Sequence, residues 1–145
     1  MNKIKMIAAY KMLMVIAVLL LAGCKYEDGP AISLRSKKAR AANTWQIDKA
    51  FENGVDRTNE YKNTFVNYQM VMNKDLSYTL SYRPFNISNL EEKGAWDFSD
   101  KKNAITFIPT GNSSGGEWRI LRLKEHEAWV LQTIDGKEVE LRMKD

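Results

Sequence analysis

From position 44 onward, hydrophobic and polar residues alternate along the chain with a period of two. In the first such stretch, apolar Trp45 and Ile47 alternate with polar Gln46 and Asp48. Alternation places every second side chain on the same face, which is typical of a half-buried β-strand. Seven further stretches with strand character follow, separated by turns or loops: residues 65–72, 77–82, 94–98, 104–109, 117–124, 128–134 and 139–143. The pattern therefore predicts eight short strands.

Residues 117–124 break the alternation, because Trp118 and Ile120 differ in parity from Leu121 and Leu123. One extra residue in the strand, a β-bulge near Ile120, would return both pairs to the same face. The last two strands are joined by residues 135–136, an Asp-Gly pair that favours a tight two-residue hairpin turn.

No segment between these strands shows helical periodicity, so the sequence predicts an all-β domain with antiparallel neighbours. An open sheet of eight strands would expose two long edges, whereas closure into an up-and-down barrel removes both. The interior of an eight-stranded barrel either is filled by side chains or holds one small ligand. One short helix is expected before the barrel, over residues 33–42, with Ser33 as its N-cap.

The connection lengths give the predicted barrel a direction. Connections after the first, third and fifth strands are long and share one end with the 135–136 turn, whereas those at the other end are short. The long ones are residues 54–63, 84–93 and 110–116, and the short ones are residues 73–75, 99–103 and 125–126. The first strand and the 33–42 helix begin at the short-loop end. We therefore expect a floor at that end and an open mouth at the other.

A different pattern precedes the helix. Three lysines within the first eleven residues lead into an uncharged run, residues 12–23, that is too short to span a bilayer as a helix. It ends in Leu-Ala-Gly before Cys24, which resembles the lipobox of bacterial lipoproteins. The resemblance implies a signal peptide over residues 1–23, cleavage before Cys24 and acylation of its thiol. Residues 24–32 would then be a tether, and residues 33–145 the barrel domain.

Composition narrows the function classes. Three of the 22 basic residues and none of the 18 acidic residues fall in the predicted signal peptide, so the mature chain is nearly neutral and gives no reason to expect nucleic-acid binding. The lone cysteine would be acylated, and the single histidine, His126, lies between two glutamates in a predicted turn. Glu91 and Glu92 are adjacent on a predicted loop and need not converge. We therefore expect no enzymatic activity, no metal and no cofactor.

Short motifs at the strand starts resemble the lipocalin-like domain lipoproteins of Bacteroidetes, over most of residues 32–143. Trp45 stands where that family has the Trp of Gly-x-Trp, although position 43 is Asn, and Gly94-Ala95-Trp96 resembles the second half of the pattern. The resemblance implies that Arg142 in the last strand stacks on Trp45. It also implies an outer-membrane location. The sequence of residues 25–28, Lys-Tyr-Glu-Asp, resembles a surface-export signal, with an ordinary charged tether as the alternative.

Aromatic residues at strand ends beside the long loops are the candidate ligand-binding residues: Phe51, Tyr82, Phe107 and Trp118. Ligand sites favour barrel mouths lined by apolar and aromatic groups. Four other aromatics at strand parity are expected in the core, namely Trp45, Tyr78, Trp96 and Trp129. Two functions stay open. One is a carrier of a small apolar or amphipathic ligand in the mouth, and the other is a structural or inhibitory module with a filled barrel that contacts a protein partner through its long loops.

Overall fold

The computed structural model describes residues 34–134 and 136–145. The predicted signal peptide, the tether and Cys24 lie outside the described residues. Within these ranges, no helix is long and apolar enough to cross a bilayer.

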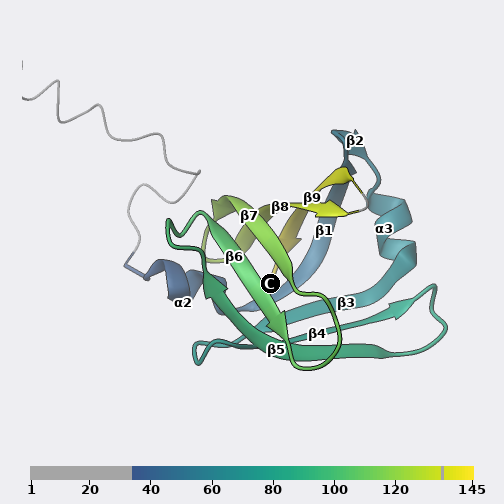
Figure 1. Ribbon diagram of the computed structural model, residues 1–145. Coiled ribbons are helices and arrows are strands. Elements are labelled where there is room, and N and C mark those ends of the chain that lie inside the picture. Colours follow the sequence, from purple (N-terminus) through teal and green to yellow (C-terminus); the bar gives the residue numbers. More distant parts are fainter. Residues whose placement is uncertain (1–33, 135) are drawn as a thin grey trace, which may run out of the picture.

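The domain is a closed antiparallel barrel, as the alternation predicts (Figure 1). Neighbours in sequence are neighbours in the sheet, and pairing of β1 with β9 closes eight strands on themselves. A two-residue strand, β2, pairs with the end of β1. The strands are β1 (Thr44–Glu52), β2 (Val55–Asp56), β3 (Phe65–Met72), β4 (Ser77–Pro84), β5 (Leu90–Phe98), β6 (Ala104–Pro109), β7 (Gly116–Leu123), β8 (Glu127–Ile134) and β9 (Lys137–Lys144).

Both helices differ from what the sequence predicted. The 33–42 helix is shorter, α2 (Lys37–Ala41), and its N-cap is Ser36, whose hydroxyl accepts from the Ala39 amide. A second helix, α3 (Thr58–Thr64), lies within the first long connection, so the expectation of no internal helix is wrong. The Asp56 carboxylate accepts a hydrogen bond from the Thr58 amide at 2.9 Å, and this contact helps to start α3.

Bulges in β7, β1 and β3 set which side chains face inward. The shift of β7 against β8 between Ile120 and Arg122 confirms the predicted bulge, and Trp118, Ile120 and Leu123 are all buried. A second, unpredicted shift lies in β1 between Ile47 and Lys49. It reverses the parity of the rest of β1, so that Ala50 faces the core.

The helix α2 lies at the short-loop end of the barrel (Figure 1). Buried indole rings fill this end, as expected for a floor. Trp45 and Trp96 are each about 1% exposed. Their ring N–H groups donate to the carbonyls of Ala41 and Asn73, both at 3.0 Å, so neither indole is buried with an unpaired donor. Tyr78 is also buried. The prediction that these three aromatics belong to the core is confirmed.

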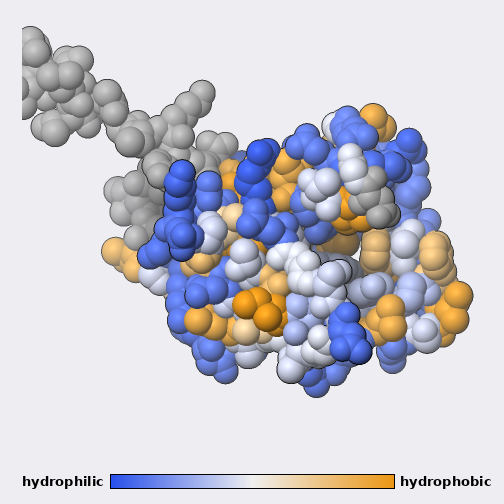
Figure 2. Space-filling model, in the orientation of Figure 1, coloured by the Kyte–Doolittle hydropathy of each residue, from blue (hydrophilic) through white to orange (hydrophobic). Residues whose placement is uncertain are grey.

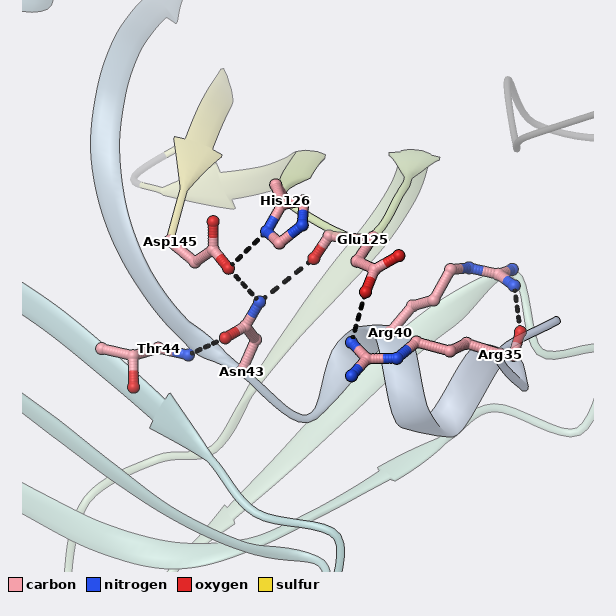
Figure 3. A network of polar contacts seen from close by, with 7 residues as sticks. All are labelled: Arg35, Arg40, Asn43, Thr44, Glu125, His126 and Asp145. Atoms are coloured by element: carbon pink, nitrogen blue, oxygen red, sulfur yellow. Dashed lines mark hydrogen bonds and ion pairs between the residues drawn. The ribbon is translucent and has the colours of Figure 1, made fainter. Parts of the chain in front are cut away.

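Polar contacts tie the start of β1 to the floor turns (Figure 3). The Asn43 amide donates to the Glu125 carbonyl at 3.1 Å and to the Asp145 carboxylate at 2.8 Å. That carboxylate also pairs with His126 Nδ1 at 2.8 Å, and both contacts hold the pKa of Asp145 below its usual value. His126 therefore serves as a surface partner of the C-terminal residue.

Candidate functional site

The long-loop end of the barrel is open and leads into a cavity of about 230 Å³ (Figure 2). Residues from α3, from the connection between β6 and β7 and from the inward faces of the strands line it. They are Ile47, Tyr61, Phe65, Tyr68, Met70, Leu80, Tyr82, Glu92, Phe107, Ser114, Gly116, Trp118, Gln132, Ile134 and Leu141. Most of these side chains are apolar or aromatic, which is the usual character of a small-molecule site.

One wall of the cavity consists of four aromatic rings from α3, β3 and β4. Tyr61 lies 5.7 Å from Phe65, which in turn lies 5.3 Å from Tyr82, measured between ring centroids. Tyr68 stacks on Tyr82 at 6.4 Å. The helix α3 contributes Tyr61 to this wall, so the element that the sequence pattern missed forms part of the site.

The facing wall comes from β6 to β8. Phe107 and Trp118 meet edge to face with centroids 4.7 Å apart. The indole N–H of Trp118 donates to Gln132 Oε1 at 3.1 Å, which fixes the ring against β8. Phe107 also packs on Tyr78 at 5.2 Å, so the wall is continuous with the core below it.

Glu92 places a carboxylate between the two aromatic walls. It lies on β5, which runs between β4 and β6. The Tyr78 hydroxyl donates to Glu92 Oε1 at 2.7 Å. The prediction that Glu92 lies on a loop is wrong, because β5 begins at Leu90 and alternation directs Glu92 inward and Glu91 outward. Among the described residues that line the cavity, Glu92 alone carries a formal charge.

Burial perturbs the phenols around this carboxylate. Desolvation raises the pKa of Tyr68 well above its usual value, and the charges of Tyr82 and Glu92 add to the effect. Desolvation also raises the pKa of Tyr78, as does the hydrogen bond to Glu92. Both phenols are therefore neutral at physiological pH and act as hydroxyl groups.

Comparison with known proteins shows which fold the barrel resembles. Neither a scan against protein-family models nor a search of curated proteins found a match. A solved lipocalin-like protein from Bacteroides uniformis ATCC 8492 has a TM-score of 0.55 at 9% identity, and the match covers 73% of this chain and 98% of that one. The barrel is lipocalin-like. An uncharacterized protein from Bacteroides eggerthii DSM 20697 is similar too, with a TM-score of 0.51 at 10% identity over 72% and 98% of the two chains.

The lipocalin-like barrel brings three of the four predicted ligand-binding residues together. Tyr82, Phe107 and Trp118 all line the cavity. Phe51 does not, because the bulge in β1 turns it to the outer face, where the Arg142 guanidinium lies 4.5 Å from its ring centroid. Cys24, the predicted lipidation site, lies outside the described residues.

Two further predictions, for Arg142 and for Trp129, are wrong, and both residues lie on the same outer face. Arg142 does not stack on Trp45; it stacks on Trp129, with its guanidinium 4.1 Å from the ring centroid. Arg122 lies over Trp129 as well, at 4.6 Å. Trp129 is thus half-buried on the outside of the barrel and does not belong to the core, since Ala128 and Val130 take the inward positions of β8.

Several residues of the site were not identified from the sequence. Tyr61, Phe65, Tyr68 and Glu92 all line the cavity but were not among the candidate ligand-binding residues. A bulge in β3 between Val66 and Gln69 lets Phe65 face inward, although its parity is opposite to that of the inward-facing Tyr68, Met70 and Met72. Asn67 has a φ of 56°, and its left-handed backbone was the one local hint of that bulge, since Asn adopts this conformation more readily than most residues.

No group of histidine, cysteine, aspartate or glutamate side chains in residues 34–134 and 136–145 is arranged to hold a metal ion.

Proposed function

We propose that this protein binds a small apolar or amphipathic molecule in the mouth of its lipocalin-like barrel. The observation that carries the proposal is the aromatic cavity of about 230 Å³ at the open end. An empty apolar cavity of about 150 Å³ suffices for benzene, so this one has room for a ring with a short substituent. Glu92, Gln132 and Ser114 supply a few polar groups to orient it.

We place this barrel in the cell envelope, as an outer-membrane lipoprotein with its mouth directed away from the membrane. The lipobox-like sequence before Cys24 supports the anchor. The described residues begin beside α2 at the floor, so a tether leading into α2 would leave the mouth unobstructed (Figure 1). We propose a binding role for the protein and no enzymatic one.

Trp118 offers the direct test of ligand binding. We expect 2-phenylethanol, which joins one ring to one hydroxyl, to bind the wild-type domain in calorimetric or NMR titrations. Replacement Trp118→Ala should weaken binding by about twofold to tenfold, the value of one aromatic contact. Trp129→Ala is the matched control and should leave affinity unchanged, because that indole lies on the outer face. If neither 2-phenylethanol nor a charged molecule of the same shape binds the wild-type domain, the proposal is refuted.

Substitution of Cys24 tests the proposed lipid anchor. In cells fed a palmitate analogue, the wild-type chain should take up label and Cys24→Ser should not, because Cys24 is the chain's only thiol. Equal labelling of both chains would show that the acyl group, if any, is attached elsewhere.

A second candidate function rests on the rim of the mouth. Phe85 and Ile87, in the connection between β4 and β5, are 67% and 79% exposed, and Leu90 beside them is 46% exposed. Large apolar side chains grouped in this way often mark a protein contact. In that reading the long loops dock onto a partner and the cavity is incidental. Replacing Phe85 and Ile87 by serine would then abolish the contact and leave ligand affinity unchanged.

A further inference from the structure

The charge and the rings of the cavity point to one class of ligand. Apart from Glu92, the lining residues are uncharged. The basic side chain at the adjoining rim, Lys137, is already paired with Glu52 at 2.9 Å. A ligand that enters the mouth therefore meets a single negative charge inside a largely apolar enclosure.

The aromatic walls favour the same sign of charge. Rings attract cations through the negative potential over their faces, and the effect strengthens where water is excluded. Tyr61, Phe65, Tyr68 and Tyr82 form a wall of adjoining rings on one side, and Phe107 and Trp118 stand opposite. Rings from both sides of the barrel thus surround the position of the carboxylate.

Glu92 has acceptor capacity left for a ligand. The Tyr78 hydroxyl occupies Oε1, and no other hydrogen bond to the carboxylate occurs in the described residues. A carboxylate offers two oxygens with about four acceptor sites in total, so a donor on a ligand can reach it without displacing Tyr78. A ligand carboxylate or phosphate, by contrast, would meet like charge in a site of low polarity.

We propose that the cavity selects organic ammonium ions, with the amine held by Glu92 among the tyrosine rings and the apolar part packed between Phe107 and Trp118. This inference rests on the proposed function and narrows it from any small amphipathic molecule to a cationic one. The accepting carboxylate and the ring faces suit a primary or methylated amine on a single ring or short chain, in keeping with the cavity volume.

Three probes of nearly equal shape test the inference: 2-phenylethylammonium, neutral 2-phenylethanol and anionic 3-phenylpropionate. Titrated into the wild-type domain at pH 7, the ammonium should bind at least about tenfold more tightly than the alcohol, the effect of one charge-assisted hydrogen bond. The anion should bind most weakly. Glu92→Gln keeps the shape and an acceptor for Tyr78, and it should remove the preference for the ammonium.

Glu91→Gln is the matched control. Glu91 is the preceding residue on the same strand, exposed on the outer face and paired with Lys93 at 2.7 Å. Its loss of charge should leave the ratio of the two affinities as in wild type. Equal binding of ammonium and alcohol, or an unchanged ratio in Glu92→Gln, would overturn the inference and leave the proposed function standing. Binding of none of the three probes would overturn both.

Discussion

At the scale of single residues, the main feature of the cavity is a small set of polar atoms surrounded by apolar side chains. Tyr68 is an example, since its ring stacks on Tyr82 and burial raises the pKa of its hydroxyl. Glu92 takes part by accepting from Tyr78 and by adding negative charge near Tyr68. These phenols and the carboxylate place polar groups in and beside a largely apolar cavity, where a ligand of the proposed class would meet them.

The raised pKa of Tyr68 makes a prediction for alkaline stability. Folding favours the neutral phenol, so this contribution is complete below a pH of about 10, the pKa in the unfolded chain, and is lost as pH rises toward the higher folded-state pKa. Between pH 8 and pH 11 the wild-type free energy of unfolding in urea should fall by about 1 kcal/mol more than that of Tyr68→Phe. Equal losses in the two proteins would show that Tyr68 ionises as freely in the fold as in the unfolded chain.

Residue types alone predicted part of the site. Tyr82, Phe107 and Trp118 were identifiable because each is an aromatic at an inward position near the end of a strand. Phe51 looked equivalent and is not, since the parity of β1 changes after Ile47. Ala50 and Phe51 are both apolar, so a shift of register left no trace in the hydrophobic pattern.

At the scale of elements, alternation and turn chemistry were enough to predict the eight barrel strands, the closure of the barrel and the bulge in β7. The same signals did not predict the strand or helix segments that consist mostly of polar residues. The β5 segment from Leu90 to Lys93 is mostly charged, yet it continues the strand and brings Glu92 into the cavity. The α3 sequence has Tyr61 as its single large apolar residue, so no helical stripe could reveal it.

A substitution at Gly94 tests how closely β5 packs against β6 and Tyr78. A Cβ at this position of β5 would lie 2.2 Å from the Ile108 carbonyl oxygen and 2.7 Å from the Tyr78 ring, so glycine permits the close approach of β6 and of Tyr78. Gly94→Ala should lower the free energy of unfolding by about 1–3 kcal/mol through overpacking. It should also weaken ligand binding, because Tyr78 positions Glu92.

Gly116 supplies the control for that substitution. It lies at the start of β7, where a Cβ would have no neighbour within 4 Å. Gly116→Ala should therefore leave stability close to wild type in the same urea titration. Similar losses at both positions would mean that the effect comes from strand glycines in general and not from crowding at Gly94.

At the scale of the whole molecule, the two ends of the barrel have separate roles. The floor is filled by α2, Trp45 and Trp96 and is tied together by Asn43, while the mouth holds the aromatic cavity. The sequence predicted this polarity because connection lengths differ between the ends. It left open whether the interior is filled or hollow, since that depends on which of many apolar side chains reach the axis. The structure shows a filled floor beneath a hollow mouth.

Methyl NMR during titration tests the central claim, that small ligands bind inside the mouth. With 2-phenylethanol and then 2-phenylethylammonium as probes, the methyl signals of Ile47, Leu80 and Leu141, which line the cavity, should shift in a saturable way. Those of Leu123, buried at the floor, should stay in place. If neither probe moves the cavity methyls, or if floor and cavity signals shift alike, the mouth of this barrel is not a binding site.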